Sequence, residues 1–493
     1  MINQRTHTTV LSAAAIACII TYSHKIQATE AQDTYLRNQI EQHQLTGDPS
    51  SGRDLPSIDD ASAQLGKQLF FTKLLSGNKD TACVSCHHPR LGGGDNLSLP
   101  IGVDAQQPDL LGPGRLHTTG SMGYDAGPTV PRNAPTTYNI GLWDKALFHD
   151  GRLESLGKTP GVNGADGEGI RTPTTPFGIP DTTAHNLTQG QAMFPVSSPE
   201  EMREEFMAGE DIADLHKALS ERLKQFSGWQ TAFSEVFSPD ENNDVINPEN
   251  LFHAIGEYER SQVFVENAWK RYVEGDDNAL SKSQKRGASL FFKPVDEGGA
   301  GCVSCHSGDF FSDEQFHVSG FPQLGRGKGD GRFGDEDYGR YRETGERVDR
   351  FAFRTPSLLN VEYTAPYGHA GSFPELEDMI RYHAHPQLAF DYYPFDKATL
   401  AARLQTGIQR SHAKRNTRKA VRRLGRLIKN GKSKLEPRYL SPRQAKHLAN
   451  FLRALSDKRI EDSDFMAKWI PADNEPDHDG MRLRAVDADG NPL

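Results

Sequence analysis

The chain has 493 residues, a formal net charge of −10 and a mean hydropathy of −0.64. This length predicts two or more domains rather than one small domain, and the acidic balance argues against nucleic acid as a partner. Of the five cysteines, four fall in two short motifs, so no pair is left for a disulfide framework.

The first 28 residues have the pattern of an export signal. A basic start precedes an apolar run from Val10 to Tyr22, and small residues follow near Ala28. The run is shorter than the ~20 residues that span a bilayer, which favours a cleaved signal peptide at 1–28. An uncleaved anchor and a lipoprotein signal ending at Cys18 are the alternatives. We therefore expect export to the periplasm.

Two similar units follow along the chain. Each begins with a segment that predicts an amphipathic helix carrying a Leu-Phe-Phe patch, at 65–71 and at 286–292. Each continues to the sequence Cys-Val-Ser-Cys-His, at 83–87 and again at 302–306. The repeat predicts two domains built on the same plan.

The Cys-x-x-Cys-His motif is the attachment signature of a c-type haem. Its cysteines lie about one helical turn apart, so both can form thioether bonds to one porphyrin, and the adjacent histidine then lies under the iron. A zinc site or a thioredoxin-like redox pair could explain one such motif, but two copies in the same context favour haem. The haem-binding residues are then Cys83, Cys86 and His87 in the first copy and Cys302, Cys305 and His306 in the second.

These features predict a mainly α-helical protein of two cytochrome-c-like domains, each with one covalent c-type haem, and with long irregular loops. We place the N-terminal domain at 29–265, the C-terminal domain at 266–470 and a polar tail at 471–493.

Five other stretches have a recognisable pattern. Residues 157–190 and 320–347 are rich in glycine and lack periodicity, which indicates long surface loops or pocket rims. Apolar spacing predicts one helix over 251–272 and a closing helix over 441–455. The basic run at 409–434 is typical of a solvated helix, and a dock for an acidic partner is its functional alternative.

Three further blocks accompany the haem motifs, at 131–136 (Pro-Arg-Asn-Ala-Pro-Thr), at 149–152 (His-Asp-Gly-Arg) and at 353–371. Together they make the chain similar to the bacterial di-haem cytochrome c peroxidases and the related MauG proteins from about Leu65 to Leu455. The third block is the most specific, because no generic cytochrome c contains it. The resemblance implies that peroxide reacts at the N-terminal haem, while the C-terminal haem stores and passes electrons.

For the first iron, the resemblance implies His87 as proximal ligand. Many family members carry a second histidine that blocks this iron, but at the corresponding place this chain has Val103, which cannot ligate. We therefore expect one open face, with His117 or His88 as the alternative second ligand.

Above that open face the resemblance places a glutamine and a glutamate. Gln191 would hydrogen-bond the bound peroxide, and Glu201 would carry a proton from one peroxide oxygen to the other. The neighbouring Glu200 is the competing candidate, and a carboxylate at a helix start can also be purely structural.

For the second iron, the resemblance implies His306 and a second axial ligand at His383. Tyr382 and Met379 lie close by and are alternatives. Histidine on both faces would lower the potential relative to methionine. Between the haems the family usually has a tryptophan, whereas this chain has His149; Trp143 lies earlier in the sequence.

The resemblance also implies a calcium ion between the domains. Its ligands would be the Asn133 side chain and the backbone carbonyls of Thr364 and Pro366, oxygen ligands that suit Ca²⁺. Arg152 and Arg354 would pair with haem propionates, although either could be an ordinary ion pair.

The leading hypothesis is therefore an exported di-haem peroxidase that reduces hydrogen peroxide with electrons from a small cytochrome c or copper protein. A MauG-like enzyme that oxidises a protein partner is the second hypothesis. A di-haem electron carrier without catalysis is the third, and oxygenase chemistry is the fourth. Peroxidases of this family are often dimers, so a homodimer is a further possibility.

Overall fold

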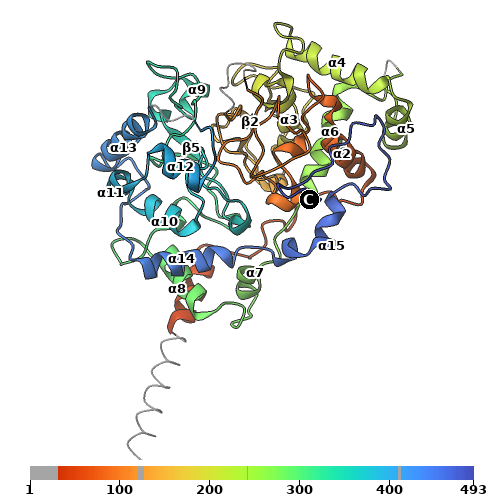
Figure 1. Cartoon of the computed structure of the whole chain (residues 1–493). Helices are drawn as coiled ribbons and strands as arrows, with labels where there is room; N and C mark the ends of the chain where they lie inside the picture. The colour runs from red at the N-terminus through yellow and green to blue at the C-terminus, as the bar shows by residue number, and fades with distance from the viewer. Residues whose placement is uncertain (1–30, 120–126, 241–242, 409–411) are drawn as a thin grey trace, which may run out of the picture.

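The computed structural model forms two mainly helical lobes that lie side by side (Figure 1). It describes residues 31–119, 127–240, 243–408 and 412–493. The predicted signal peptide at 1–28, with Cys18, and the start of the basic run at 409–411 lie outside the described residues. Within the described ranges no helix is long and apolar enough to cross a membrane. The prediction of a mainly α-helical fold with long irregular loops is confirmed.

The N-terminal lobe is built on a close contact between α2 (Ala61–Phe71) and α6 (Pro248–Arg260). A Cβ atom on Gly66 would lie 1.9 Å from the backbone oxygen of Ala254, so the helices can approach this closely only at a glycine. The other helices are α3 (Leu187–Ala192), α4 (Ile212–Lys224) and α5 (Ser227–Val236). An antiparallel sheet packs on α3 in the order β1 (Ala146–Leu147), β2 (Leu153–Ser155), β3 (Ile170–Arg171).

The C-terminal lobe repeats this arrangement with α8 (Lys282–Phe292) and α14 (Pro442–Arg453). Here a Cβ atom on Gly287 would lie 2.0 Å from the backbone oxygen of His447. Both predicted Leu-Phe-Phe helices and the closing helix are thus confirmed. The remaining elements are β4 (Phe316–Val318), α9 (Tyr341–Thr344), β5 (Ala352–Arg354), α10 (Leu376–Ala384), α11 (Pro386–Ala389), α12 (Lys397–Arg403), α13 (Ala413–Lys429) and α15 (Ser463–Met466).

The prediction of one helix over 251–272 is wrong. α6 ends at Arg260, and α7 (Ala268–Val273) is a separate helix. In the segment between them, the buried Phe264 donates its backbone N–H to the side-chain oxygen of Asn139 (2.7 Å). A partner from elsewhere in the chain thus satisfies a backbone group that the helix would otherwise have bonded, and apolar spacing alone does not reveal such a partner.

Both ends of the described chain cross to the other lobe. Near the beginning, Lys285 of α8 pairs with Asp33, and Asp309 accepts hydrogen bonds from the backbone of Thr46. At the other end, Leu483 donates its backbone N–H to the carbonyl of Phe71 at the end of α2 (2.8 Å). The carboxyl terminus accordingly lies beside the N-terminal lobe (Figure 1). The polar segment 471–493 therefore packs against the N-terminal lobe.

Candidate active site

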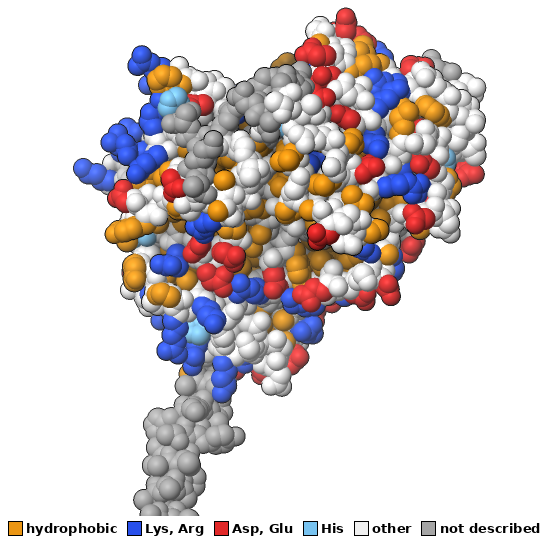
Figure 2. All heavy atoms as spheres, in the orientation of Figure 1, with side chains coloured by type: hydrophobic (Ala, Val, Ile, Leu, Met, Phe, Trp, Pro, Cys, Tyr) orange, Lys and Arg blue, Asp and Glu red, His pale blue; other side chains and the backbone are white. Residues whose placement is uncertain are grey.

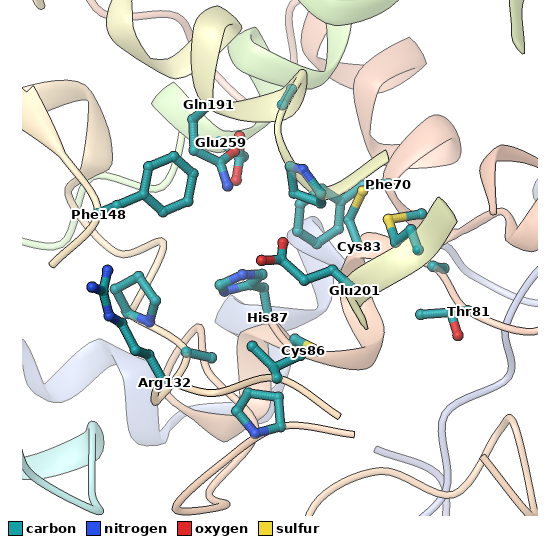
Figure 3. Close-up of a pocket in the computed structure, with 18 of the residues that line it drawn as sticks. Phe70, Thr81, Cys83, Cys86, His87, Arg132, Phe148, Gln191, Glu201 and Glu259 are labelled. Atoms are coloured by element: carbon teal, nitrogen blue, oxygen red, sulfur yellow. The ribbon is translucent and has the colours of Figure 1, made fainter. Parts of the chain in front are cut away.

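The first cavity lies in the N-terminal lobe and has about 750 Å³ of empty space, including open solvent. Cys83, Cys86 and His87 line it, where the short 3-10 helix η2 (Cys83–Ser85) brings them together (Figure 3). The Nδ1–H of His87 donates to the backbone carbonyl of Gly93 (3.1 Å). This bond orients the ring and leaves Nε2 available as a metal ligand.

Gln191 and Glu201 also point into the first cavity (Figure 3). Gln191 is buried near the end of α3, and Glu201 lies on a π-helical turn, η6 (Pro199–Arg203). Turns of this rare kind are frequent at functional sites. The turn is packed closely, since a Cβ atom on Gly102 would lie 2.3 Å from the backbone oxygen of Glu201.

Glu201 is the acidic residue of this turn that lines the cavity, and Glu200 is not among the lining residues. The Glu200 carboxylate instead accepts a hydrogen bond from the Ser198 hydroxyl (3.0 Å). Burial raises the pKa of Glu201, while Arg152, whose Nη2 lies 3.6 Å from Oε1, opposes the rise. The result is a carboxyl group that is more basic than an exposed glutamate.

The alternative ligands for the first iron do not reach this cavity. His88 and His117 are both buried, and neither lines it. Val103, which cannot ligate, is also buried and does not line the cavity. The histidines that line it are His87 and His149.

The second cavity lies in the C-terminal lobe and encloses about 2360 Å³, including open solvent. Cys302, Cys305 and His306 line it, on and just after the 3-10 helix η7 (Cys302–Ser304). The Nδ1–H of His306 donates to the carbonyl of Phe311 (3.1 Å), as that of His87 does to Gly93. The two motifs therefore present a proximal histidine in the same way.

His383 of α10 faces His306 across the second cavity. Their ring centroids are 6.4 Å apart and their planes meet at 78°. Since bonds from imidazole nitrogen to a metal ion are about 2 Å long, this separation leaves room for one metal ion between the rings. Phe321 stacks on His383 at 5.2 Å and holds its orientation.

The side chains near His383 are occupied or less well placed. The Tyr382 hydroxyl donates to the carbonyl of Gly320 (2.8 Å), and this residue does not line the cavity. The Nδ1 of His385 accepts a hydrogen bond from the backbone of Leu388. Met379 does line the cavity, but His383 is the residue whose ring faces His306.

The two cavities share one wall, formed by residues 133–135 and His149. The Nε2–H of His149 donates to the carbonyl of Asn133 (3.0 Å), which ties this ring into the wall. Trp143 lines only the second cavity, where the guanidinium of Arg354 stacks 3.4 Å above its ring. His149, not Trp143, is therefore the aromatic ring that borders both cavities.

The chain is similar to known di-haem peroxidases and MauG proteins. The family model for di-haem cytochrome c peroxidases matches residues 60–278. The methylamine utilization protein MauG of Methylorubrum extorquens is 28% identical over 340 residues, 67% of this chain and 72% of that protein. The cytochrome c551 peroxidase of Nitrosomonas europaea is 26% identical over 344 residues, 70% and 79% of the two chains. Residues 60–278 of this chain are therefore a di-haem cytochrome c peroxidase domain.

The match makes the chain a haem peroxidase, and the family implies two haems. A solved structure supports the fold: the di-haem peroxidase BthA of Burkholderia thailandensis matches with a TM-score of 0.52 and 19% identity, over 84% of this chain and 89% of that one. The chemistry of each cavity fits a c-type haem, because each offers two thiols and an imidazole whose Nδ1 is already bonded.

A half-buried cation that lines the second cavity gives independent support for a haem there. Arg354 lines it and, within the described ranges, forms no ion pair; its Nη1 donates to the carbonyl of Ala146 (2.8 Å). Burial lowers the pKa of Arg354. An anion would relieve this cost, and a haem propionate is such an anion. Arg152 already contacts Asp150 and Glu201, and it stacks on Phe148.

The residues expected to bind calcium gather at the second cavity, which Asn133, Thr364 and Pro366 all line. The Asn133 amide donates through Nδ2 to the carbonyl of Leu97 (2.9 Å). This bond directs the Nδ2 of Asn133 away and leaves its side-chain oxygen available as a ligand.

Sequence reasoning missed a buried ion network beside the first cavity. Arg132 pairs with Asp150 of its own lobe and with Asp337 of the C-terminal lobe (2.7 Å). These pairs raise the pKa of Arg132 and lower those of both aspartates. Asp337 belongs to the segment 320–347, which therefore reaches Arg132, a residue that lines the first cavity. Arg132 and Asp150 lie in two of the blocks of family resemblance, but the sequence does not show their partner.

Glu259 was also missed. It is 1% exposed, lines the first cavity (Figure 3), and its Oε2 has no hydrogen-bond partner in the described part of the chain. Burial raises its pKa well above the ordinary value. Burial in the cavity wall therefore disfavours the charged form of this carboxyl group. On α6 the sequence shows only an acidic residue next to Arg260, which gives no sign of burial.

Proposed function

We propose that the chain reduces hydrogen peroxide at the haem of the first cavity, with electrons relayed through the haem of the second. The unequal placement of histidines carries this proposal. His383 faces His306 in the second cavity. The partner of His87 in lining the first cavity is His149, whose Nε2–H is bonded to the wall. One iron would then have a free face for peroxide and the other would have both faces filled, which suits electron storage.

The chain's own residues supply proton transfer and positioning. When bound, haem provides the redox chemistry. The Glu201 carboxylate accepts the proton of one peroxide oxygen and returns it to the other, so that water becomes the leaving group. Its raised pKa makes it a better base than an exposed glutamate, and the Gln191 amide orients the peroxide by a hydrogen bond.

Electrons would cross between the cavities through the shared wall, where His149 takes the place that a tryptophan usually has in the family. An imidazole is harder to oxidise than an indole, so hopping through His149 is slow. Transfer between the haems is therefore the step that we expect to limit turnover.

The second candidate is peroxide-dependent oxidation of a protein partner, as the resemblance to MauG implies. His383 favours it, because histidine on both faces lowers the potential and makes the second haem a poorer acceptor for high-potential donors. The electron-carrier hypothesis has less support, because neither His88 nor His117 lines the first cavity.

Three further expectations complete the proposal. A calcium ion binds Asn133 and the carbonyls of Thr364 and Pro366, which line one cavity. The chain is exported to the periplasm by its N-terminal segment. A small cytochrome c or copper protein supplies the electrons.

Electron paramagnetic resonance of the oxidised, haem-loaded protein tests the proposal. We expect one high-spin signal from the first haem and one low-spin signal from the second, and the high-spin signal should respond to peroxide. Two low-spin signals that do not respond to peroxide would refute it. Slow turnover with reduced cytochrome, alongside peroxide-driven oxidation of a protein, would select the second candidate.

A further inference from the structure

Helix α13 carries a row of exposed basic side chains on its outer face, which we call the basic row. Its members follow one another at intervals of three or four residues, so they lie on one side of the helix. They are Lys414, Arg418, Arg422, Arg426 and Lys429. No aspartate or glutamate occurs between 413 and 434, and within the described ranges none of the five forms an ion pair. Lys and Arg side chains gather at the edge of the molecule where α13 lies (Figure 2).

The basic row is not what holds α13 in place. Other residues of the helix do that: Arg415 and Lys419 pair with the consecutive acidic residues Asp335 and Glu336. On the inner face Val421 and Leu424 are buried. Like charges four residues apart repel one another and weaken a helix. The row therefore opposes the stability of the element that carries it, which points to a role outside the fold.

Exposed apolar side chains border the basic row. α11 packs against α13, and the guanidinium of Arg418 lies 5.6 Å from the ring of Phe390. On either side of Phe390, Leu388 is 45% exposed and Tyr392 is 81% exposed. A small apolar patch beside charged side chains is the usual composition of a protein–protein interface.

The same helix lies close to the second cavity. Gly320, which follows β4, abuts Val421 and Leu424 of α13. The carbonyl of Gly320 accepts a hydrogen bond from the hydroxyl of Tyr382, and the next residue, Phe321, stacks on His383. One short segment therefore connects the inner face of α13 with the ring that faces His306.

We propose that the basic row docks a small soluble electron carrier with an acidic face, which passes its electrons to the haem of the second cavity. The inference rests on the proposed function and names the entry surface for its reductant. Each docking oxidises the carrier by one electron and reduces the second haem by one. Two such events, with two protons from solvent, supply what one hydrogen peroxide needs to become two waters.

A carrier protein fits these observations better than a lipid surface. Its electrons have a use at this position, because the segment under α13 leads to His383. The exposed Leu388 and Tyr392 supply the apolar contact that a transient protein complex needs beside its charges. Attraction of an acidic carrier to the basic row, on a chain of net charge −10, also favours binding at this place.

The test compares two triple variants of the haem-loaded protein that change net charge equally. R418Q/R422Q/R426Q neutralises the basic row, and R286Q/R443Q/K446Q neutralises exposed side chains on α8 and α14. The probe is a reduced small c-type cytochrome of acidic isoelectric point. Stopped-flow spectroscopy measures how fast it reduces the second haem at about 10 mM and about 200 mM salt, where the Debye length falls from about 30 Å to under about 10 Å.

We expect the wild-type rate constant to fall with salt. The row variant should be at least about tenfold slower at low salt and nearly independent of salt, because electrostatic steering is lost, while the control variant should match wild type. Equal rates in both variants would overturn the proposal. So would loss of binding to phosphatidylglycerol vesicles in the row variant with an unchanged cytochrome rate, which would identify a membrane-binding surface instead.

Peroxide consumption driven by ascorbate, measured on the same proteins, tests the proposed function separately. Both variants should consume peroxide like wild type, because neither changes a residue at either cavity. Absence of consumption in all three proteins would refute the proposed function, while the salt dependence of cytochrome oxidation would still decide the docking surface.

Discussion

The two lobes present the haem motif alike but differ in the residues that face it across the cavity. Each pairs a Leu-Phe-Phe helix with a partner helix through a glycine, Gly66 or Gly287. Each bonds the Nδ1–H of its motif histidine to a backbone carbonyl. Beyond that, a π-helical turn brings Glu201 into the first cavity, whereas α10 brings His383 into the second.

This difference shows how one repeated unit can serve two purposes. The attachment side depends on residues within a few positions of the motif. The other side depends on segments about 100 positions away for Glu201 (201 − 87 = 114) and closer to 80 for His383 (383 − 306 = 77). Such segments can change without disturbing attachment. The proposed contrast between a reactive and a storage centre therefore depends on Glu201 and His383.

The largest effect is expected from E201Q. Loss of the group that transfers the proton should lower the rate of the reaction with peroxide by roughly 10²–10⁴-fold. The signal of the second haem should stay unchanged. Stopped-flow mixing of the protein with peroxide measures the rate.

E200Q is the matched control, because the Glu200 carboxylate bonds to Ser198 and does not line the cavity. We expect its rate to stay within a factor of about three of wild type, as for a surface change worth under about 0.5 kcal/mol. Equal losses in the two variants would assign the proton transfer to neither carboxylate.

H383A should make the second centre resemble the first. Without the ring that faces His306, the low-spin signal of the second haem should be replaced by a high-spin one, and the potential should rise. M379A is the control, since Met379 lines the same cavity but the imidazole faces His306. An oxidised spectrum that is unchanged in H383A and altered in M379A would transfer the ligand role to methionine.

Features of the fold and of the site that depend on neighbouring residues could be predicted from the sequence. Features that depend on residues far apart in the sequence could not. Local apolar spacing predicts helices at 65–71, 286–292 and 441–455, and the structure has them at 61–71, 282–292 and 442–453. Local spacing does not predict the end of α6 at Arg260, because that break depends on a hydrogen bond to Asn139, which lies far away in the sequence. Resemblance indicated Glu201 and His383, and the structure places both in cavities. Nothing local could show that Asp337 crosses to Arg132, or that Glu259 is buried.

Gly66 and Gly287 allow a test of the helix contact that the two lobes have in common. G66A and G287A would each place a methyl group about 2 Å from a backbone oxygen, so the helices must separate. We expect each to destabilise its lobe by roughly 1–3 kcal/mol, with a similar fall of several degrees in Tm. G425A is the control: on α13 its methyl group meets only a side chain at 3.9 Å, and alanine favours the helix by up to about 1 kcal/mol. Strongly unequal losses in G66A and G287A would show that the lobes are not built alike.

The smallest effect concerns Lys328, a residue of the C-terminal lobe whose charge lowers the pKa of Glu201 in the N-terminal lobe. Proton transfer begins from the carboxylate, so the peroxide rate should fall as pH decreases through the pKa of Glu201, which burial raises above its ordinary value. K328Q removes a positive charge, so that pKa should rise and the acid limb of the pH–rate profile should move to higher pH. At pH 7 the change should stay below about tenfold, because partly exposed charge pairs are worth less than about 1 kcal/mol.

K328R keeps the charge and should keep the profile, whereas E201Q should have no such acid limb in its pH–rate profile. A K328Q profile that coincides with wild type would show that the charge of Lys328 does not tune the carboxyl group of Glu201.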